Sequence, residues 1–425
     1  MNTDYRRMWT ELGMDLKAHD ALLEALNQGY REIYLSQKNR PQGMRYFDFV
    51  LGQVHGQRIQ ELREEQQAGR KIIGSYCVFV PEEIVLAGNA TLVGLCSGAD
   101  FAMEEVEKVL PRNTCALIKS SFGFKLGKVC PFLEVSDMVV GENTCDGKKK
   151  SYETLRDLVE NMYVMDMPQM KTEEGRALLR SEYKRFLQAV EELTGTSIDV
   201  ARLKQGIQTV NAKRQAMARL QRLRWNDPAP ISGLDGLLAS QVFFYDNPER
   251  FTKSVNTLCD ELEQRVENKE GVMPQDTPRI LMSGCPMAVP NWKMPYLVES
   301  AGGVIVGEES CVGERGNRNL VDDSGETLDA LIDALVDRYF QIECAIFTPN
   351  PDRLERIKKM YADAQADGVI HYSIQFCQPY IMESIPVEKA LEAEDIPCLR
   401  VETDYSMEDA GQLSTRIEAF LEVLK

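Results

Sequence analysis

The sequence predicts an α/β protein built from two Rossmann-like parallel-sheet domains, with a helical N-terminal segment and a helical insert. Three observations support this fold class: short apolar runs alternate with helical stretches in two separate parts of the chain, these two parts resemble each other, and long helical patterns fill the remainder. The length of 425 residues also exceeds what one ordinary core accommodates, so several domains are expected.

Residues 1–70 are predicted to form a helical N-terminal segment, which includes "DALLEALNQGYREIYL" and "GQRIQELREEQQAGRK". Residues 71–165 are predicted to form a first α/β domain. Its strand candidates are "KIIGSYC", "ATLVGLC" and "DMVVGENTC", and its helix candidates are "PEEIVLAG", "AMEEVEKVL" and "KKKSYETLRDLVENMY". Strands that alternate with helices in this way indicate βαβ units and a parallel sheet.

Residues 166–275 return to long helical patterns, such as "EEGRALLRSEYKRFLQAVEEL" and "VARLKQGIQTVNAKRQAMARLQRL", interrupted by "NDPAPISG". We expect a helical subdomain or lid here. Residues 276–425 are predicted to form a second α/β domain, with strands in "RILMSGC", "GVIVGEESC" and "VIHYSIQFC" and helices in "LDALIDALVDRYF" and "DRLERIKKMYADAQADG". A last strand–helix pair begins at "PCLRVE".

The two α/β parts indicate an internal duplication. "SYCVFVPEEIVLAGNATLVGLC" aligns with "SGCPMAVPNWKMPYLVESAGGVIVGEESC", since each has a strand, a cysteine, a Val-Pro, a short helix, an Ala-Gly and a second strand that ends in cysteine. Continuing the alignment pairs eight cysteines at separations of 208, 215, 229 and 232 residues, which rise slowly as loops lengthen. The pairs are Cys77 with Cys285, Cys96 with Cys311, Cys115 with Cys344, and Cys145 with Cys377.

The composition excludes some classes of partner. A net charge of −17 argues against nucleic acid or an anionic membrane, because both require a basic face. The sequence shows no signal-peptide pattern at its start and no apolar run of about 18 residues, so a cytosolic protein is expected. In a reducing compartment its eleven cysteines are not expected to form disulfides.

Most of the cysteines follow predicted strands. In a parallel α/β sheet, ligands bind outside the carboxyl ends of the strands. Two such edges that face each other across a cleft would bring thiols from both halves together. The cysteines that follow apolar runs are Cys77, Cys96, Cys145, Cys285, Cys311 and Cys377.

The spacing of the cysteines favours some kinds of thiol chemistry over others. A zinc site or a thioredoxin-type redox pair would be expected to show C-x-x-C, which does not occur. A catalytic thiol needs a base, and among the three histidines (His19, His55 and His371) only His371 lies near a cysteine in sequence, six residues before Cys377. Iron–sulfur clusters do not need C-x-x-C, since single thiolates from separate strand ends can converge on one cubane. A nucleotide site is poorly supported, because "GFKLGKV" lacks the phosphate-loop spacing.

Other residues have ordinary structural interpretations. Cys259, Cys344 and Cys398 are expected to be core residues, and Cys130 fits either a core or a ligand role. Cys145 lies between a strand end and a polar helix start, where the helix dipole and nearby lysines favour a thiolate. The three lysines, Lys148, Lys149 and Lys150, are expected by default to be a solvated first turn. Carboxylates near strand ends are expected to be solvated or capping residues: Glu82, Glu83, Glu308 and Glu309.

Four stretches carry a family resemblance: "YCVFVPEEIVLAG", "LPRNTCALIKSSFGFKLGKVCPF", "DMVVGENTCDGKKKSYE" and "IPCLRVETDYSMEDAGQLSTRIEAFLE". They resemble the 2-hydroxyacyl-CoA dehydratase and benzoyl-CoA reductase superfamily, and most closely its double-cubane cluster branch. The resemblance implies two α/β domains with an iron–sulfur centre between them. In dehydratase subunits three cysteines, which match Cys115, Cys145 and Cys377, hold a single [4Fe–4S] cubane.

The double-cubane branch instead implies two linked [4Fe–4S] cubanes, a homodimer and a separate ATP-hydrolysing iron–sulfur activator. Cys77, Cys96, Cys285 and Cys311 offer the additional thiols, and the sequence does not decide which three complete the second cubane. The implied function is ATP-dependent reduction of a small unsaturated molecule. A single-cubane 2-hydroxyacyl-CoA dehydratase-type subunit and a non-catalytic electron-transfer protein remain alternatives, and neither the substrate nor the proton donors can be named.

Overall fold

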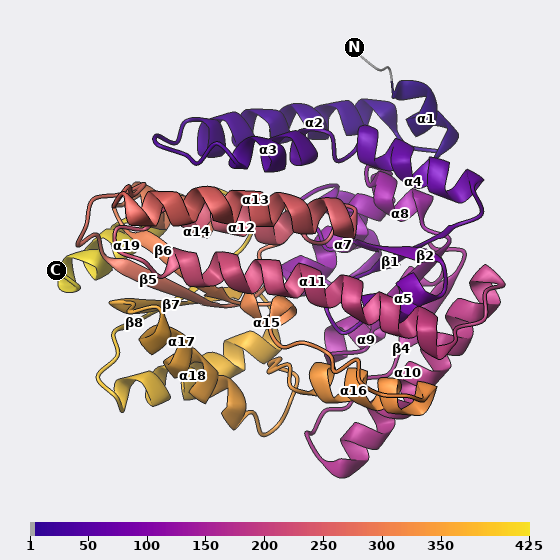
Figure 1. Cartoon of the computed structure of the whole chain (residues 1–425). Helices are drawn as coiled ribbons and strands as arrows, with labels where there is room; N and C mark the ends of the chain where they lie inside the picture. The colour runs from indigo at the N-terminus through magenta and orange to yellow at the C-terminus, as the bar shows by residue number, and fades with distance from the viewer. Residues whose placement is uncertain (1–4) are drawn as a thin grey trace.

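The computed structural model describes residues 5–425. Figure 1 shows two sheets side by side, with the N-terminal helices laid across one side of the molecule as a separate layer. This layer consists of α1 (Arg6–Glu11), α2 (Leu16–Tyr30), the π-helical turn η1 (Arg31–Leu35), α3 (Met44–Gly52) and α4 (Gln57–Gln67). The expected helical N-terminal segment is therefore confirmed over the described residues.

The first sheet is parallel and has the strand order β2-β1-β3-β4. Its strands are β1 (Lys71–Ser75), β2 (Ala90–Gly94), β3 (Met138–Glu142) and β4 (Met162–Met165). The helices of this half are α5 (Glu82–Ala87), α6 (Met103–Val109), α7 (Ala116–Leu126), α8 (Pro131–Val135) and α9 (Asp146–Leu155).

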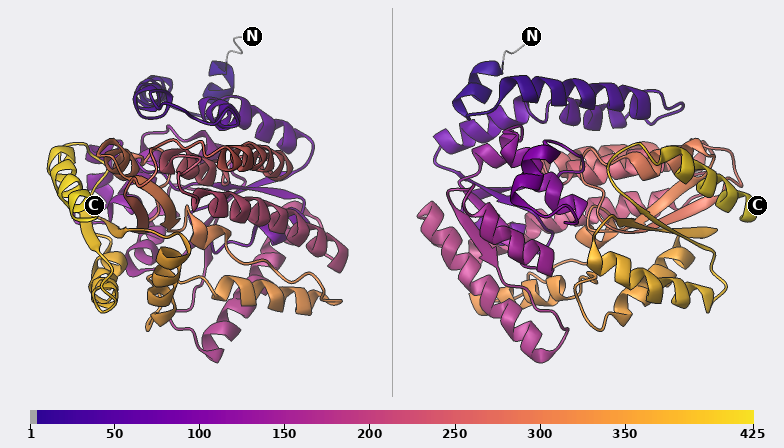
Figure 2. Two further views of the ribbon diagram at one scale, coloured as in Figure 1. Left: turned by 60° about the vertical axis from the view of Figure 1, so that its left-hand side comes forward. Right: turned by 180° about the vertical axis from the view of Figure 1, so that it is seen from behind.

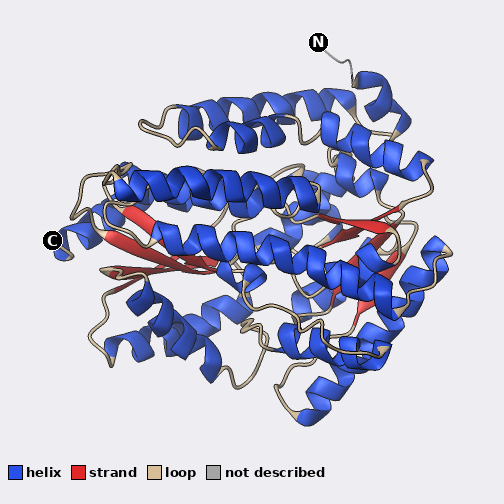
Figure 3. Ribbon diagram, in the orientation of Figure 1, coloured by secondary structure: helices blue, strands red, loops and turns tan. Residues whose placement is uncertain are grey.

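The second sheet is also parallel, with the equivalent order β6-β5-β7-β8. Figure 3 shows the strands gathered in two separate groups, with helices around them. Its strands are β5 (Arg279–Gly284), β6 (Val304–Glu309), β7 (Gly368–Ile374) and β8 (Cys398–Thr403). The helices of this half are α14 (Lys293–Ser300), α15 (Glu314–Asn317), α16 (Leu328–Phe340), α17 (Pro351–Asp363), α18 (Gln378–Glu392) and α19 (Ala410–Val423). Two parallel sheets of one topology confirm the predicted α/β fold class, and the shared order supports the internal duplication.

The insert between the halves is helical, as expected. It contains α10 (Glu173–Thr194), α11 (Val200–Arg224), α12 (Gly233–Val242) and α13 (Pro248–Glu267). Helix α11 packs on α5 of the first half and reaches β6 of the second half (Figure 2). Every residue of α12 is buried, so this helix belongs to the core of the molecule.

One predicted element is wrong in its extent. The helix expected over "KKKSYETLRDLVENMY" ends at Leu155, and residues 162–165 form strand β4 instead. Met162 pairs with Val139 and Met165 with Glu142, so strand pairing with β3 overrides the local helical pattern.

The apolar core is continuous from the N-terminal layer to the second sheet. Phe47 of α3 and Leu258 of α13 belong to the same cluster as Trp292 and Ile370 of the second half. None of the helices that the structure describes combines the length and the apolar character that crossing a bilayer requires.

Candidate metal centre

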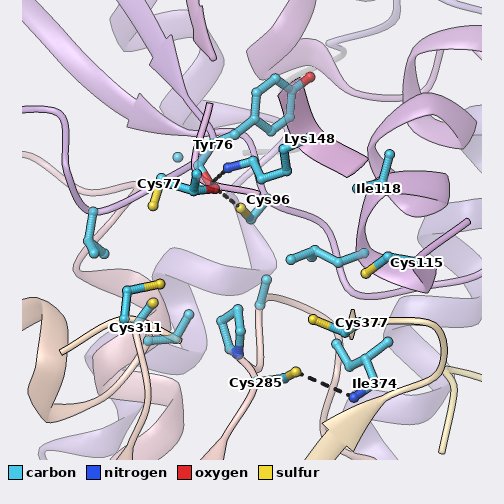
Figure 4. A pocket seen from close by; sticks show the side chains of 18 of the residues that line it. Tyr76, Cys77, Cys96, Cys115, Ile118, Lys148, Cys285, Cys311, Ile374 and Cys377 are labelled. Atoms are coloured by element: carbon cyan, nitrogen blue, oxygen red, sulfur yellow. Dashed lines mark hydrogen bonds between the residues drawn. The ribbon is translucent and has the colours of Figure 1, made fainter. Parts of the chain in front are cut away.

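The carboxyl ends of the two sheets border one internal cavity of about 120 Å³. Ser75 and Gly94 end strands β1 and β2 at its wall, and Ile374 ends β7 there. Eight of the eleven cysteines line this cavity, and they come from both halves (Figure 4). They are Cys77, Cys96, Cys115, Cys145, Cys285, Cys311, Cys344 and Cys377. All seven cysteines singled out from the sequence are therefore brought together.

Cys344 is the member that the sequence interpretation left out. It is buried in the apolar core, as expected, but it also borders the cavity. The signal that could have found it is the internal repeat, which pairs it with Cys115. The two remaining core candidates, Cys259 in α13 and Cys398 at the start of β8, do not border the cavity.

A first group of neighbouring thiols consists of Cys77, Cys311 and Cys344. Burial raises the pKa of Cys77 well above its ordinary value, and the nearby sulfurs of Cys311 and Cys344 raise it further. Burial, with Cys311 beside it, also raises the pKa of Cys344 to about 11.

A second group consists of Cys115, Cys285 and Cys377. The thiol of Cys377 lies beside those of Cys115 and Cys285, and these neighbouring thiols act on its pKa. The Cys285 sulfur also accepts a hydrogen bond from the backbone N–H of Ile374, at 3.4 Å (Figure 4). Gly284, just before Cys285, has a φ of +125°, and a Cβ there would lie 1.9 Å from the Tyr372 carbonyl oxygen. Only glycine fits at this position.

Two of the cysteine pairs that the internal repeat relates have one member in each of these groups. Cys77 belongs to the first group, and its repeat partner Cys285 belongs to the second. Cys344 belongs to the first group, and its partner Cys115 belongs to the second. Each group therefore contains thiols from both halves of the chain.

Three helices begin immediately after cavity cysteines. Cys115, Cys145 and Cys377 are the N-cap residues of α7, α9 and α18. Backbone N–H groups of the first helical turns lower the pKa values of these thiols, as those of Gly147 and Lys148 do at Cys145. Helix N-termini carry partial positive charge, so these ends favour an anionic group in the cavity.

The surroundings that favour a thiolate at Cys145 are present, but burial of this residue opposes them. The helix N-terminus and Lys148 do act in the expected direction, but burial outweighs them and raises the pKa of Cys145. Burial likewise raises the pKa of Cys96 to about 12. Coordination to a metal ion displaces the proton of a thiol outright, so a bound metal centre would hold its cysteine ligands as thiolates.

Lys148 differs from the solvated residue that was expected. Its side chain is 16% exposed and borders the cavity, with Nζ 3.3 Å from Oε2 of the fully buried Glu142. Nζ also lies 3.5 Å from the Tyr76 carbonyl oxygen, which accepts the Cys96 thiol at 2.9 Å (Figure 4). Lys148 is the only charged side chain among the described residues that line this cavity. It provides positive charge beside the thiols.

The four glutamates near strand ends differ from the solvated or capping residues that were expected. They are buried and form ion pairs, three of which lead to helix α11, so that this helix is tied to both halves. The pairs are Glu82 with Lys213, Glu83 with Arg214, Glu308 with Arg224, and Glu309 with Arg315.

His371 does not serve the thiols as a base, because it is buried in β7 and does not border the cavity. Among the described residues, no three His, Cys, Asp or Glu side chains are grouped for a single metal ion. Eight free thiols are soft donors. Their distribution around one cavity suits a polynuclear iron–sulfur centre, whose irons are ligated separately.

The chain matches the family model described as 2-hydroxyglutaryl-CoA dehydratase, D-component, over residues 77–424. YjiM of Escherichia coli (strain K12), which is named as a dehydratase subunit, is 38% identical across 86% of this chain and 94% of its own length. The (R)-phenyllactyl-CoA dehydratase beta subunit of Clostridium sporogenes is 26% identical across 85% and 94% of the two chains. One of the benzoyl-CoA reductase subunits of Thauera aromatica is 22% identical across 82% and 89%.

Proposed function

The chain belongs to the 2-hydroxyglutaryl-CoA dehydratase D-component family, and on that premise we propose that it is an iron–sulfur reductase of small unsaturated molecules. The observation that supports this proposal best is the single cavity at which eight cysteines from both halves meet. Three thiols suffice for the single cubane that the family resemblance implies for a dehydratase subunit. The surplus favours two linked cubanes.

We assign Cys115, Cys145 and Cys377 to one [4Fe–4S] cubane, as the resemblance implies. Cys77, Cys311 and Cys344 form the separate group of neighbouring thiols and are our candidates for the second. Cys96 and Cys285 border the same cavity and could replace a member of either set. Bound here, such a centre supplies single electrons at low potential.

The chain itself would ligate this centre, limit the access of water to it and compensate its negative charge. The walls between the cysteines are mostly apolar, with Leu117, Ile118 and Val312 among them, and they limit the access of water. Lys148 and the N-termini of α7, α9 and α18 oppose the negative charge of thiolate-ligated iron.

The proposal includes two partners. Relatives of this chain are named as single subunits of dehydratases and of a reductase, which supports a function that depends on other proteins. The family resemblance implies a separate ATP-hydrolysing iron–sulfur activator as electron donor and a second copy of this chain in a homodimer. Reduction of the iron centre that requires both ATP and the activator would support this assignment, and reduction by the activator without ATP would contradict it.

A second candidate is a single-cubane subunit of a 2-hydroxyacyl-CoA dehydratase. The names of the relatives favour it, since several are dehydratase subunits that act on CoA esters. An acyl-CoA also carries phosphates, which call for basic side chains. Among the described lining residues the thiol cavity offers Lys148 for this role, and Lys148 is already paired with Glu142.

Iron and acid-labile sulfide per chain, measured after anaerobic purification, separate the two candidates. Two linked cubanes require about eight irons per chain, and a single cubane requires about four. Zinc without sulfide would refute both candidates.

A further inference from the structure

A second cavity, of about 200 Å³, lies between the N-terminal layer and the first sheet. Its walls come from α1, α2, the end of α3, the residues that follow β2, and the segment before α14. Seven of the 23 lining residues are Phe, Tyr or Trp, including Trp9, Tyr30, Phe124, Phe132, Tyr245 and Trp292. Among the described lining residues there is no Asp, Glu, Lys or Arg.

This aromatic chamber adjoins the thiol cavity. Gly94, Cys96, Tyr245 and Val289 border both spaces, so they form a shared wall. The Tyr245 hydroxyl donates to the Cys96 carbonyl oxygen at 3.2 Å, which fixes one side of this wall. Cys96 is the cavity thiol that also faces the chamber.

One edge of the chamber carries an imidazole pair. His55 borders the chamber, and its Nδ1 lies 3.0 Å from Nε2 of the fully buried His19. Trp9 holds this pair in place, since its Nε1 donates to the His55 carbonyl oxygen at 2.7 Å and its ring packs edge-on against His19. Burial lowers the pKa of His55 to about 3 and that of His19 to about 4, so both rings are neutral. The chamber therefore offers hydrogen-bonding groups without charge.

We propose that the aromatic chamber is a binding site for an uncharged, planar molecule of about the size of a benzene ring, held next to the thiol cavity. A buried apolar cavity of about 150 Å³ is large enough to bind benzene, so a ring of this size fits. Ring faces and edges offer favourable packing to an unsaturated ligand. The absence of cations among the described lining residues excludes the phosphates of a CoA ester.

This inference rests on the proposed function in one respect. It limits the substrates of the proposed reductase to small, uncharged, unsaturated molecules that can occupy the chamber beside Cys96. Binding in the chamber itself does not require iron, so the two proposals can fail separately.

Gly52, the exposed last residue of α3, can take a larger side chain at the rim of the chamber with little strain. It borders the chamber, it does not have a positive φ, and a Cβ added there would meet no atom within 4 Å. Gly411 in α19 is the matched control, because a Cβ there also meets open space and this residue borders neither cavity. The variants are Gly52→Phe and Gly411→Phe.

The probe is fluorobenzene, and its binding to the anaerobically purified protein is followed by ¹⁹F NMR. We expect saturable binding to the unmodified protein and to Gly411→Phe, and at least tenfold weaker binding to Gly52→Phe. A crystal soaked with iodobenzene should show the anomalous signal of iodine between Trp9 and Trp292. Equal binding by all three proteins, or iodine found only elsewhere, would overturn the proposal. About eight irons per chain without fluorobenzene binding would refute the chamber alone, and binding without an iron centre would refute the proposed function alone.

Discussion

The two halves of the molecule share a scaffold but not a charge distribution. Each has the same strand order and a cysteine that caps the helix after its third strand: Cys145 before α9 and Cys377 before α18. Three residues further on, the first half places Lys148 at the cavity, whereas the second half places Tyr380 there. The duplicated features are therefore those that position thiols.

The second half obtains positive charge near the thiols from a different element. Arg315 of α15 donates to the Cys311 sulfur at 3.5 Å, and Glu309 and Tyr380 hold the guanidinium. Glu309 has a second cation, Arg353, while Glu142 has only Lys148 among the described residues. Thiol positions are thus preserved between the halves, and electrostatic partners are not.

The largest effect is expected where the halves are equivalent. Cys145→Ser and Cys377→Ser should each remove at least half of the bound iron, because each takes a thiolate from the proposed ligand set. Iron and sulfide per chain after anaerobic purification measure this loss. Matched controls are Cys259→Ser and Cys398→Ser, whose thiols lie outside the cavity and should leave the iron content unchanged. Equal iron retention in all four variants would refute the division of the cysteines.

The next effect is expected where the halves differ. Lys148→Met leaves the carboxylate of Glu142 buried without its cation, and breaking a buried pair costs roughly 3–5 kcal/mol. Burial raises the pKa of Glu142, and Lys148 opposes that rise. In Lys148→Met, Glu142 can remain protonated and uncharged at a pH below its pKa in the folded protein. The loss of stability should therefore grow as pH rises through that pKa, because the buried carboxylate then becomes charged without a cation. Denaturant unfolding at pH 6 and pH 8 measures it.

The control for this effect is the double variant Lys148→Met with Glu142→Gln, which contains no buried charge at this position. It should recover most of the lost stability at pH 8. If the double variant is as unstable as Lys148→Met alone, then Lys148 stabilises the fold through packing and not through its charge.

Much of the fold could be predicted because its signals are local. Alternating apolar runs and helical patterns identify the strands β1 to β3 and β5 to β8 from nearby residues alone. Strand β4 was missed because its short segment is extended only through pairing with β3. The buried helix α12 was not distinguished from its neighbours in the insert, since a helix buried all round has no polar face to mark it.

The candidate site, like the fold, could be predicted only where nearby residues mark it. Six cavity cysteines were predicted because they follow strands, and Cys115 was predicted from the family resemblance. Cys344 was left out despite its place in the repeat, because it lies in the apolar "QIECAIF", which is typical of a core strand or helix. Nothing local separates Lys148 from Lys149, because only the helix register turns one of them inward. The aromatic chamber joins Trp9, Tyr245 and Trp292 from distant parts of the chain, so no single stretch of sequence could indicate it.

A smaller, pH-dependent effect on the free energy of unfolding is expected at Glu299. The repeat alignment pairs this residue with Val85 of the first half. Glu299 accepts hydrogen bonds from the backbone N–H groups of Gly233 and Ile305, at 2.6 and 3.3 Å, and burial raises its pKa to about 7. The raised pKa lies above the unfolded value, so this stabilisation is complete below about pH 4.5 and is lost as pH rises through about 7.

Glu299→Gln removes this titration and should flatten the stability curve by about 2 kcal/mol between pH 5 and pH 8. Chemical unfolding at several pH values gives the comparison. Val85→Leu serves as a control in the first half, since it adds no titrating group and should keep the pH dependence of the unmodified protein. Parallel curves for Glu299→Gln and the unmodified protein would contradict the assignment.

The smallest effect is expected from the two lysines that follow Lys148 in α9. Lys149 and Lys150 have side chains that are 54% and 66% exposed, and their partners Asp146 and Glu153 are also exposed. Exposed ion pairs contribute about 0.5 kcal/mol or less, and cations near a helix N-terminus are slightly unfavourable. Lys149→Ala with Lys150→Ala should therefore change the free energy of unfolding by less than about 0.5 kcal/mol and leave the iron content unchanged. Loss of iron in this double variant would mean that the positive charge beside Cys145 comes from the whole helix start, and that the contrast between Lys148 and Tyr380 does not describe how the halves differ.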